Sequence, residues 1–305
     1  MPAILVVDDS TTDRRVVGIL LKRDGDWQID YAIHGGEALE KMQQAPFDLV
    51  LSDLLMPGMN GLELVAAVRR SYPHVPVILM TSRGNEGIAV LALREGAASY
   101  IPKALLPRKL GETIRRVMAV SVRRRDHGQF PDFVLGNPRS FTLGNDVAAI
   151  ERLVSCLQEN VMRVGLCDEA QGRQIGVALQ EALLNALFHG NLEAGARLST
   201  EHLEASPSLV AELGRDSPYC DRRIHASVTL TPDEATFVIR HEGKGFDPST
   251  LPDPRDASAL EKATGRGVIL MRLFMDKVMF DKSGCEVTMI KLRKSGRSPT
   301  EQGDA

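Results

Sequence analysis

Apolar and polar positions alternate in blocks over the first 120 residues of the chain. Short apolar runs predict strands at residues 3–9, 27–32, 47–53, 76–82 and 98–103. Apolar side chains recur at helical spacing in the other segments, at residues 16–23, 35–44, 61–70, 86–96 and 106–120. Because continuous apolar strands alternate with amphipathic helices, we predict an α/β domain whose parallel sheet is covered on both faces. Its chemistry is expected at the carboxyl ends of the strands.

The pattern changes after residue 140. Strict alternation predicts two hairpins, one over residues 225–241 with its turn at TPDE, and one that joins residues 277–280 to residues 286–292. Helical spacing predicts helices at residues 146–163, 169–189 and 267–276. This mixture of antiparallel strands and helices indicates an α+β domain.

The segment between these units is rich in charges, glycine and proline. Its sequence is RRRDHGQFPDFVLGNPRS at residues 123–140, which we interpret as a linker with a lead-in strand. We interpret the polar residues 192–217 as an insertion or mobile loop. The predicted organisation is a first domain, a linker, a second domain and a disordered tail, at residues 1–120, 121–140, 141–293 and 294–305.

Composition agrees with two globular domains. The chain has 305 residues, of which 43% are hydrophobic and 25% charged, so each half can bury a core. The net charge is −3, and the first 120 residues contain fourteen acidic and fourteen basic side chains. Neither half is strongly basic, so we expect no direct binding of nucleic acid.

The cysteines and the apolar runs indicate where the protein works. The four cysteines have neither metal-like spacing nor the pattern of a disulfide framework, so we expect reduced thiols. The start, MPAILVVDDS, reaches acidic residues too early for a signal peptide. No apolar run approaches the roughly 18 residues that span a membrane. We therefore expect a cytoplasmic protein without a membrane segment.

Five polar residues stand at the ends of predicted strands: Asp8, Asp9, Asp53, Thr81 and Lys103. In a parallel sheet these ends share one edge, so distant segments of the chain converge there. Three carboxylates in one place repel each other unless a divalent cation joins them, and oxygen ligands suit Mg²⁺. A carboxylate beside Mg²⁺ can act as a nucleophile toward a phosphoryl group, and Lys103 could pair with the resulting acyl phosphate.

On these residues, the first domain resembles a response-regulator receiver domain. The resemblance implies a flavodoxin-like fold with a five-stranded parallel sheet. It implies phosphorylation on Asp53 by an upstream histidine kinase or phosphotransfer protein. It also implies Mg²⁺ held by Asp8, Asp9 and Asp53, with the carbonyl oxygen of Leu55 as a further ligand.

The resemblance implies two switch residues as well. Thr81 would hydrogen-bond the phosphoryl group, and Tyr100 would rotate inward on activation; both could also be ordinary strand residues. One position departs from the family, because Ala104 follows Lys103 where proline is frequent. A cis peptide bond without proline costs about 2.5–4 kcal/mol. The geometry that follows Lys103 is therefore open.

A second group of polar residues lies on the predicted helix at residues 169–189. Glu181 and Asn185 are four residues apart and share one face of the helix. The side chain of asparagine supplies an oxygen ligand for Mg²⁺. The carboxylate of glutamate can orient or deprotonate an attacking hydroxyl.

Two glycine pairs follow in the sequence. Gly243 and Gly245 end a hairpin strand and allow the backbone to approach a ligand closely. Gly265 and Gly267 precede a helix whose free N–H groups form an anion site suited to nucleotide phosphates. The proline-rich run between the two pairs could close as a lid.

In this order, these motifs resemble the GHKL ATPase fold, a Bergerat-type α+β sandwich, over residues 140–293. The likeness is strongest to the anti-sigma factor serine kinases. It implies binding of ATP and Mg²⁺, with Asn185 on the metal and Glu181 as catalytic base. It also implies a serine or threonine acceptor on an anti-sigma antagonist protein, and partner switching that controls a sigma-type regulator.

His241 departs from this family, which usually has aspartate two positions before the first glycine to accept a hydrogen bond from the adenine amino group. A neutral imidazole can still accept one hydrogen bond. The imidazole lacks a negative charge. A hydrogen bond to a charged group contributes about 1.5–3 kcal/mol, whereas one between neutral groups contributes about 0.5–1.5 kcal/mol. We therefore expect His241 to bind ATP, but about tenfold more weakly than the aspartate would.

The same residues leave other functions to consider. A histidine kinase with His127 as phosphoacceptor needs a dimerising helix pair, for which residues 121–140 are too short and too rich in glycine and proline. A non-catalytic adaptor, in which the second domain only binds protein partners, stays open, as does a homodimer. The run PYCDRRIH at residues 218–225 could bind a partner or simply lead into a strand.

Overall fold

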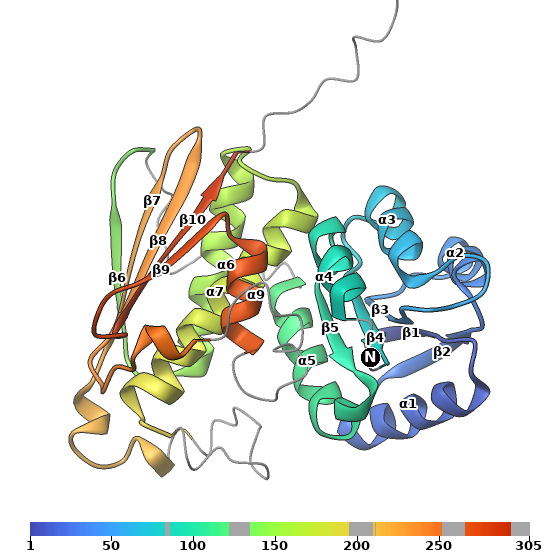
Figure 1. Ribbon diagram of the computed structural model, residues 1–305, viewed down its shortest axis with the longest axis horizontal. Coiled ribbons are helices and arrows are strands. Elements are labelled where there is room, and N and C mark those ends of the chain that lie inside the picture. The colour runs from blue at the N-terminus through green and yellow to red at the C-terminus, as the bar shows by residue number, and fades with distance from the viewer. Residues whose placement is uncertain (83–85, 122–134, 195–209, 211, 252–265, 294–305) are drawn as a thin grey trace, which may run out of the picture.

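The computed structural model describes the chain except residues 83–85, 122–134, 195–209, 211, 252–265 and 294–305. The described residues form two domains that lie side by side (Figure 1). Most of the predicted linker, most of the polar segment 192–217 and the predicted tail lie outside the described residues. Among the helices that are described, none has the length and apolar character needed to cross a bilayer.

The first domain contains a five-stranded parallel sheet, as predicted. Its strands are β1 (Ala3–Val7), β2 (Gln28–Ala32), β3 (Leu49–Asp53), β4 (Val77–Thr81) and β5 (Ser99–Pro102). They follow the order β2-β1-β3-β4-β5, and every neighbouring pair is parallel. All residues of β3 and β4 are buried, which explains why both strands appear as continuous apolar runs.

Five α-helices of the described chain surround this sheet: α1 (Thr11–Asp24), α2 (Gly35–Gln44), α3 (Gly61–Ser71), α4 (Glu86–Glu95) and α5 (Leu106–Ser121). Local signals fix where they begin. The Ser10 side chain accepts a hydrogen bond from the Asp13 N–H at the start of α1, and Asn60 and Glu63 form a capping box at the start of α3. A 3₁₀ turn at Lys103–Leu105 joins β5 directly to α5.

The second domain contains an antiparallel sheet. Its strands are β6 (Arg139–Leu143), β7 (Ile224–Leu230), β8 (Glu234–His241), β9 (Lys277–Phe280) and β10 (Glu286–Leu292). They follow the order β6-β7-β8-β10-β9, with antiparallel pairing throughout. Buried and less buried residues alternate along β7, β8 and β10, as expected for a sheet with one face on the core. Both predicted hairpins are confirmed.

Three helices pack on the face of this sheet that looks toward the first domain (Figure 1). They are α6 (Val147–Arg163), α7 (Glu169–Asn185) and α9 (Arg266–Phe274), and α7 continues as a π-helical turn at Ala186–Asn191. Nearly every residue of α7 is buried. A helix that buries its whole circumference has packing partners on all sides.

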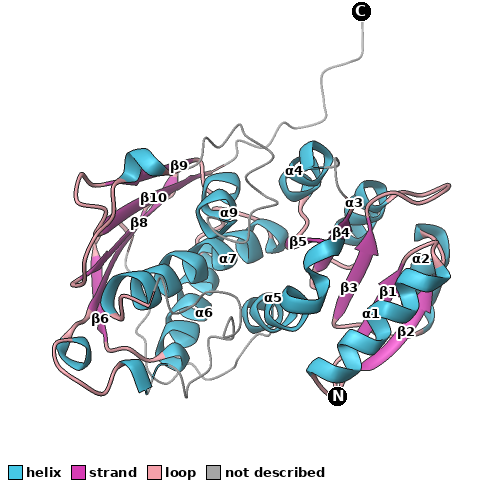
Figure 2. Ribbon diagram, turned by 60° about the horizontal axis from the view of Figure 1, so that its bottom comes forward, coloured by secondary structure: helices cyan, strands magenta, loops and turns pink. Residues whose placement is uncertain are grey.

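The first domain supplies the partners on the outer side of α7. Helices α4 and α5 contact α9 and α7, and the four helices lie together between the two sheets (Figure 2). A Cβ atom added to Gly176 would lie 2.4 Å from a methyl carbon of Val120, so α7 can approach α5 closely only because position 176 is glycine. The side chain of Gln174 donates to the carbonyl oxygen of Leu93 at the end of α4, at 2.5 Å. The sequence did not predict this interface.

Candidate functional site

The carboxyl ends of the first domain's strands form a charged site around one lysine. The Nζ atom of Lys103 lies 2.8 Å from Asp8, 3.0 Å from Asp53 and 2.6 Å from Asp13. Asp8 is fully buried and Asp53 is 5% exposed. Asp8 follows β1, Asp53 ends β3 and Lys103 follows β5, so the predicted convergence of strand ends is present. The sequence did not predict Asp13, in the first turn of α1, as a partner of Lys103. Its position about one turn after the end of β1 could have indicated this role.

Burial and charge act against each other in this site. Burial raises the pKa of Asp53, the Lys103 ion pair lowers it, and the Asp8 charge raises it again; the net pKa lies above the ordinary aspartate value. Burial alone would lower the pKa of Lys103. Its bonds to Asp13, Asp8 and Asp53 outweigh that effect, and its net pKa is raised. The lysine is therefore a permanent cation between buried carboxylates.

The three predicted metal ligands are not gathered into a ready metal centre. Within the described part of the chain, no group of three His, Cys, Asp or Glu side chains is arranged to hold a metal ion. Lys103 joins Asp8 and Asp53, and Asp9 is exposed, so the magnesium ligation predicted for Asp8, Asp9 and Asp53 stays a prediction. The donors present are all oxygen, including the backbone carbonyl of Leu55, and such donors fit Mg²⁺.

The switch residues lie on β4 and β5. Thr81 ends β4 and is 4% exposed, opposite Pro102 in the sheet register. Tyr100 is 1% exposed and belongs to the apolar cluster that continues into the second domain, so its side chain already points inward. Among the described residues Ser217–Pro218 is the one cis peptide bond, so the Lys103–Ala104 bond is trans.

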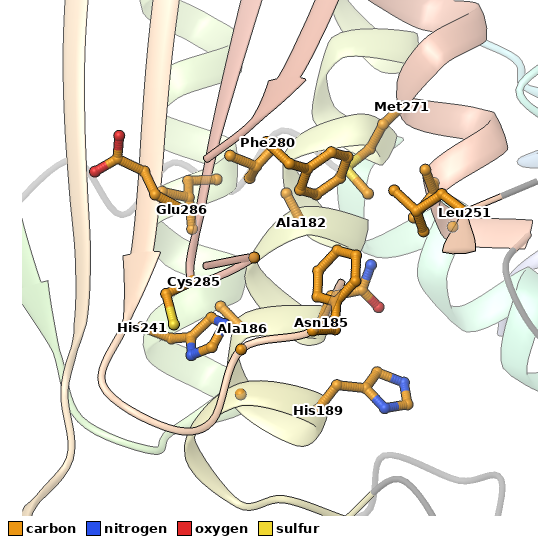
Figure 3. Close-up of a pocket in the computed structure, with 18 of the residues that line it drawn as sticks. Ala182, Asn185, Ala186, His189, His241, Leu251, Met271, Phe280, Cys285 and Glu286 are labelled. Atoms are coloured by element: carbon orange, nitrogen blue, oxygen red, sulfur yellow. The ribbon is translucent and has the colours of Figure 1, made fainter. Parts of the chain in front are cut away.

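A cavity of about 300 Å³ opens in the second domain between α7, α9 and the ends of β8, β9 and β10 (Figure 3). Asn185 and His189 lie on its α7 side, and His241 and Cys285 lie on its strand side. Apolar side chains dominate the rest of the wall, including Leu251, Met271 and Phe280. An apolar cavity with few polar groups is the usual form of a small-molecule site. The aromatic rings of Phe246 and Phe280 meet edge to face, with centroids 5.4 Å apart.

The glycines around the cavity are required by contacts within the chain. A Cβ atom at Gly243 would lie 1.9 Å from the carbonyl oxygen of Gly190, and one at Gly245 would lie 1.7 Å from that of Ser283. Both glycines are therefore constrained within the chain, and the expectation that they let the backbone approach a ligand closely stays a prediction. They bring the loop after β8 against the end of α7 and against the β9–β10 turn. Gly265 lies outside the described residues.

Gly267 has a different neighbourhood. A Cβ atom at this position would lie 2.6 Å from Oε2 of Glu181 and 3.4 Å from Nδ2 of Asn185. The start of α9 thus faces the two polar residues that sequence analysis placed on one face of α7. Glu181, with a side chain 8% exposed, does not line the cavity itself.

His241 is the polar group at the strand side of the cavity. Burial lowers the pKa of its imidazole, although a hydrogen bond with the Gly284 backbone opposes this shift. Its Nδ1 atom is buried and has no hydrogen-bond partner among the described residues. A neutral imidazole with an unpaired nitrogen can accept a hydrogen bond, so the residue fits a ligand that donates one. Glu242 faces away, as its strand position predicts, and pairs with His225 at 2.8 Å.

Glu181 is engaged from outside its own domain. The guanidinium of Arg116, on α5, forms an ion pair with the Glu181 carboxylate and also pairs with Glu112 one turn back on α5. The sequence could not reveal this pair, because the two residues are 65 positions apart and belong to different domains.

Comparison with known proteins supports both resemblances. Residues 4–115 match the family model of the response regulator receiver domain, and residues 143–291 match that of the histidine kinase-like ATPase domain. The chemotaxis protein CheY1 of Helicobacter pylori is 37% identical over 121 residues, which are 39% of this chain and 98% of CheY1. The transcriptional regulatory protein ResD of Bacillus subtilis is 38% identical over 117 residues, which are 38% of this chain and 47% of ResD.

Among solved structures, a response regulator receiver domain protein from Clostridium thermocellum has 30% sequence identity and a TM-score of 0.36, and the match covers 38% of this chain and 92% of that protein. The relatives named here match only the first domain. The assignment of the second domain depends on the family model that matches residues 143–291. The chain therefore belongs to the response regulator receiver family through its first domain, and its second domain is a histidine kinase-like (GHKL) ATPase domain.

Proposed function

We propose that this chain is a phosphorylation-controlled signalling protein whose output domain is a protein serine/threonine kinase of the anti-sigma factor type. An upstream histidine kinase or phosphotransfer protein phosphorylates the receiver on Asp53. The output domain then transfers phosphate from ATP to a small antagonist protein in the cytoplasm, and so switches a sigma-type regulator between partners.

The receiver step is the transfer of a phosphoryl group from a phosphohistidine. A carboxylate oxygen of Asp53 attacks the phosphorus, the P–N bond breaks, and the imidazole leaves with the electron pair as the acyl phosphate forms. Asp8, Asp9, Asp53 and the Leu55 carbonyl would hold Mg²⁺, which would supply positive charge beside the transferring oxygens. Lys103 and Thr81 then hold the phosphoryl group by an ion pair and a hydrogen bond.

The output step is the transfer of the terminal phosphoryl group of ATP to a hydroxyl. Glu181 accepts the proton of the serine or threonine hydroxyl while the oxygen of that hydroxyl attacks the terminal phosphorus of ATP. The bond to the ADP oxygen breaks, and ADP leaves with that electron pair. Asn185 would hold the metal that accompanies ATP, and His241 would accept a hydrogen bond from the adenine amino group.

One observation carries the kinase proposal. Gly267, at the start of α9, packs directly against both Glu181 and Asn185, beside the cavity that Asn185 and Gly267 line. A helix start offers free N–H groups to phosphates, and here a carboxylate and an amide are next to it. This arrangement supports a site where a nucleotide phosphate and a proton acceptor meet.

The adaptor alternative is supported by a separate observation. The imidazole of His241 replaces the carboxylate usual in the family, and Glu181 is already paired with Arg116. An output domain that binds partners with little or no ATP would tolerate both features. In that case only the receiver performs chemistry.

Transfer of labelled phosphate from ATP to candidate antagonist proteins separates the two functions. Antagonists are first captured with the full chain in the presence and absence of ATP. Transfer by the wild type that is lost in Glu181→Ala supports the kinase. A wild type that captures the antagonist but transfers no phosphate, with or without prior receiver phosphorylation, would establish the adaptor instead.

A further inference from the structure

Arg116 connects the two domains through charge. It lies on α5 of the receiver, and its guanidinium pairs with Glu181 on α7 of the output domain and with Glu112 on its own helix. The three side chains are 24%, 8% and 15% exposed for Arg116, Glu181 and Glu112. An ion pair this poorly hydrated is much less screened than a surface pair, and removing one partner leaves an uncompensated charge.

Both carboxylate oxygens of Glu181 are affected by this arrangement. Oε1 accepts a hydrogen bond from Arg116, and Oε2 lies on the side of Gly267 at the start of α9. One acceptor position of Oε1 is therefore already taken by the guanidinium.

The contacts around the pair hold the two domains in this arrangement. Gln174 donates to the Leu93 carbonyl, and Arg69 pairs with Asp168 at 2.6 Å, both across the same interface. None of these other contacts reaches a residue of the proposed kinase chemistry. Arg116 does so through its side chain.

Helix α5 is also the element that can carry a signal to Arg116. It follows directly from the 3₁₀ turn that begins at Lys103, the lysine shared by Asp8, Asp13 and Asp53. A phosphoryl group on Asp53 would compete for this lysine. A change in the Lys103 turn is thus transmitted to α5 through the covalent chain.

From this geometry we propose that Arg116 is a latch that masks Glu181 in the unphosphorylated protein and releases it when the receiver is phosphorylated. The latch rests on the proposed kinase function, because it regulates the residue that accepts the hydroxyl proton there. Glu112 is the second partner of the latch, since it offers the guanidinium a carboxylate within the receiver. Receiver phosphorylation moves Arg116 from Glu181 to Glu112 alone.

The functional test compares ATP turnover by the full chain in three forms: wild type, Arg116→Gln and Arg115→Gln. Each is measured with and without acetyl phosphate as a small phosphodonor. Arg116→Gln should raise the rate of the unphosphorylated protein by a factor on the order of five to one hundred and make it insensitive to acetyl phosphate. Arg115, the exposed neighbour whose side chain donates to the Asp24 carbonyl within the receiver, is the matched control and should leave the rate unchanged.

A second measurement does not depend on catalysis. Hydrogen exchange of the α7 backbone amides reports whether the domains stay closed. Arg116→Glu should open the interface by placing like charges together, and the double variant Arg116→Glu with Glu181→Arg should close it again. If no form turns over ATP but this charge reversal opens and recloses the interface, the kinase proposal fails and the Arg116–Glu181 pair remains as a contact that holds the two domains together.

Two outcomes would overturn the latch. In the first, Arg116→Gln and the wild type turn over ATP equally, and both respond equally to acetyl phosphate. In the second, exchange of the α7 amides is the same in the wild type, in Arg116→Glu and in the double variant.

Discussion

The ammonium nitrogen of Lys103 lies 3.0 Å from a carboxylate oxygen of Asp53. The same nitrogen also serves Asp8 and Asp13, so one cation compensates three acidic side chains. Two of those carboxylates, on Asp8 and Asp53, are buried, and neither has a second cation among the ion pairs of the described residues. Both the stability and the proposed chemistry of the first domain therefore depend on Lys103.

Replacing Lys103 with methionine should destabilise the protein by about 3 kcal/mol in the absence of divalent cations. That is the lower end of the range for removing one partner of a buried pair, because the lysine keeps 20% of its surface exposed. Urea denaturation in the presence of a chelator measures the change. Lys41→Met is the control, since its pair with the half-exposed Asp30 should be worth less than about 1 kcal/mol. Equal losses in the two variants would show that Lys103 has no special structural role.

Asp53→Ala should abolish formation of the acyl phosphate with acetyl phosphate or phosphoramidate. Asp53 is the carboxylate that contacts Lys103 at the carboxyl end of the central strand β3. The base-labile, hydroxylamine-sensitive label is the measurement. Asp13→Ala is the matched control, because Asp13 also contacts Lys103 but sits on α1, and this variant should keep the label. Full labelling of Asp53→Ala would mean that another residue is the acceptor.

The sequence was sufficient for features that depend on periodicity. Strands, helices and the order of both domains follow from apolar spacing, and strand ends such as Asp53 and Lys103 meet because parallel strands share one edge. Contacts between distant surfaces carry no local signal. Arg116 and Glu181 each appear as ordinary helical residues until the domains are packed. Gly176 also gives no such indication in the sequence, although the close approach of α5 requires a residue without a side chain at this position.

The sequence pointed to a glycine at position 243 and to a cation at the acidic site. The structure adds physical reasons for these features that the sequence did not provide. The residue Gly243 was predicted from its likeness to nucleotide loops, yet its immediate constraint is the carbonyl oxygen of Gly190. At the acidic site Mg²⁺ stays a prediction, and Lys103 is a cation already present between Asp8 and Asp53. The spacing of residues along the chain predicts which of them converge in the fold. It does not predict which of the converging residues pair with each other by charge or by packing.

Gly267→Ala should weaken binding of a non-hydrolysable ATP analogue by about tenfold, or about 1.4 kcal/mol. The new Cβ would lie 2.6 Å from Glu181 Oε2, so the carboxylate must move. The displaced atom is the end of a flexible side chain, so the protein should still fold. Calorimetric titration measures the affinity. Gly144→Ala is the control, because its Cβ would meet nothing within 4 Å; unchanged affinity in both variants would place the phosphates elsewhere.

The Cys167 thiol should resist alkylation in the folded protein. Burial, with a smaller contribution from the Asp168 charge, raises the pKa of Cys167 to about 12. At pH 8 the reactive thiolate is then about one molecule in ten thousand. Mass spectrometry after iodoacetamide treatment should show exposed Cys220 labelled first, and Cys167 labelled only after unfolding. Because the folded pKa is raised, the contribution of this thiol to stability should decline as the pH rises above the unfolded value near 8.5. Equal labelling rates for the two residues at pH 8 would contradict the burial of Cys167.

His241→Asp should tighten ATP binding by about tenfold, because a charged acceptor makes a stronger hydrogen bond to the adenine amino group than a neutral imidazole does. Burial lowers the pKa of His241, so the wild-type ring is neutral at physiological pH and its affinity should not change between pH 7 and pH 8. Calorimetric titration of the full chain measures both effects. His241→Asn separates charge from shape, since it has the size of aspartate without its charge, and it should bind no better than the wild type. If asparagine and aspartate tighten binding equally, the imidazole is obstructing the site by its size; if both weaken it, the histidine itself is the better adenine acceptor in this cavity.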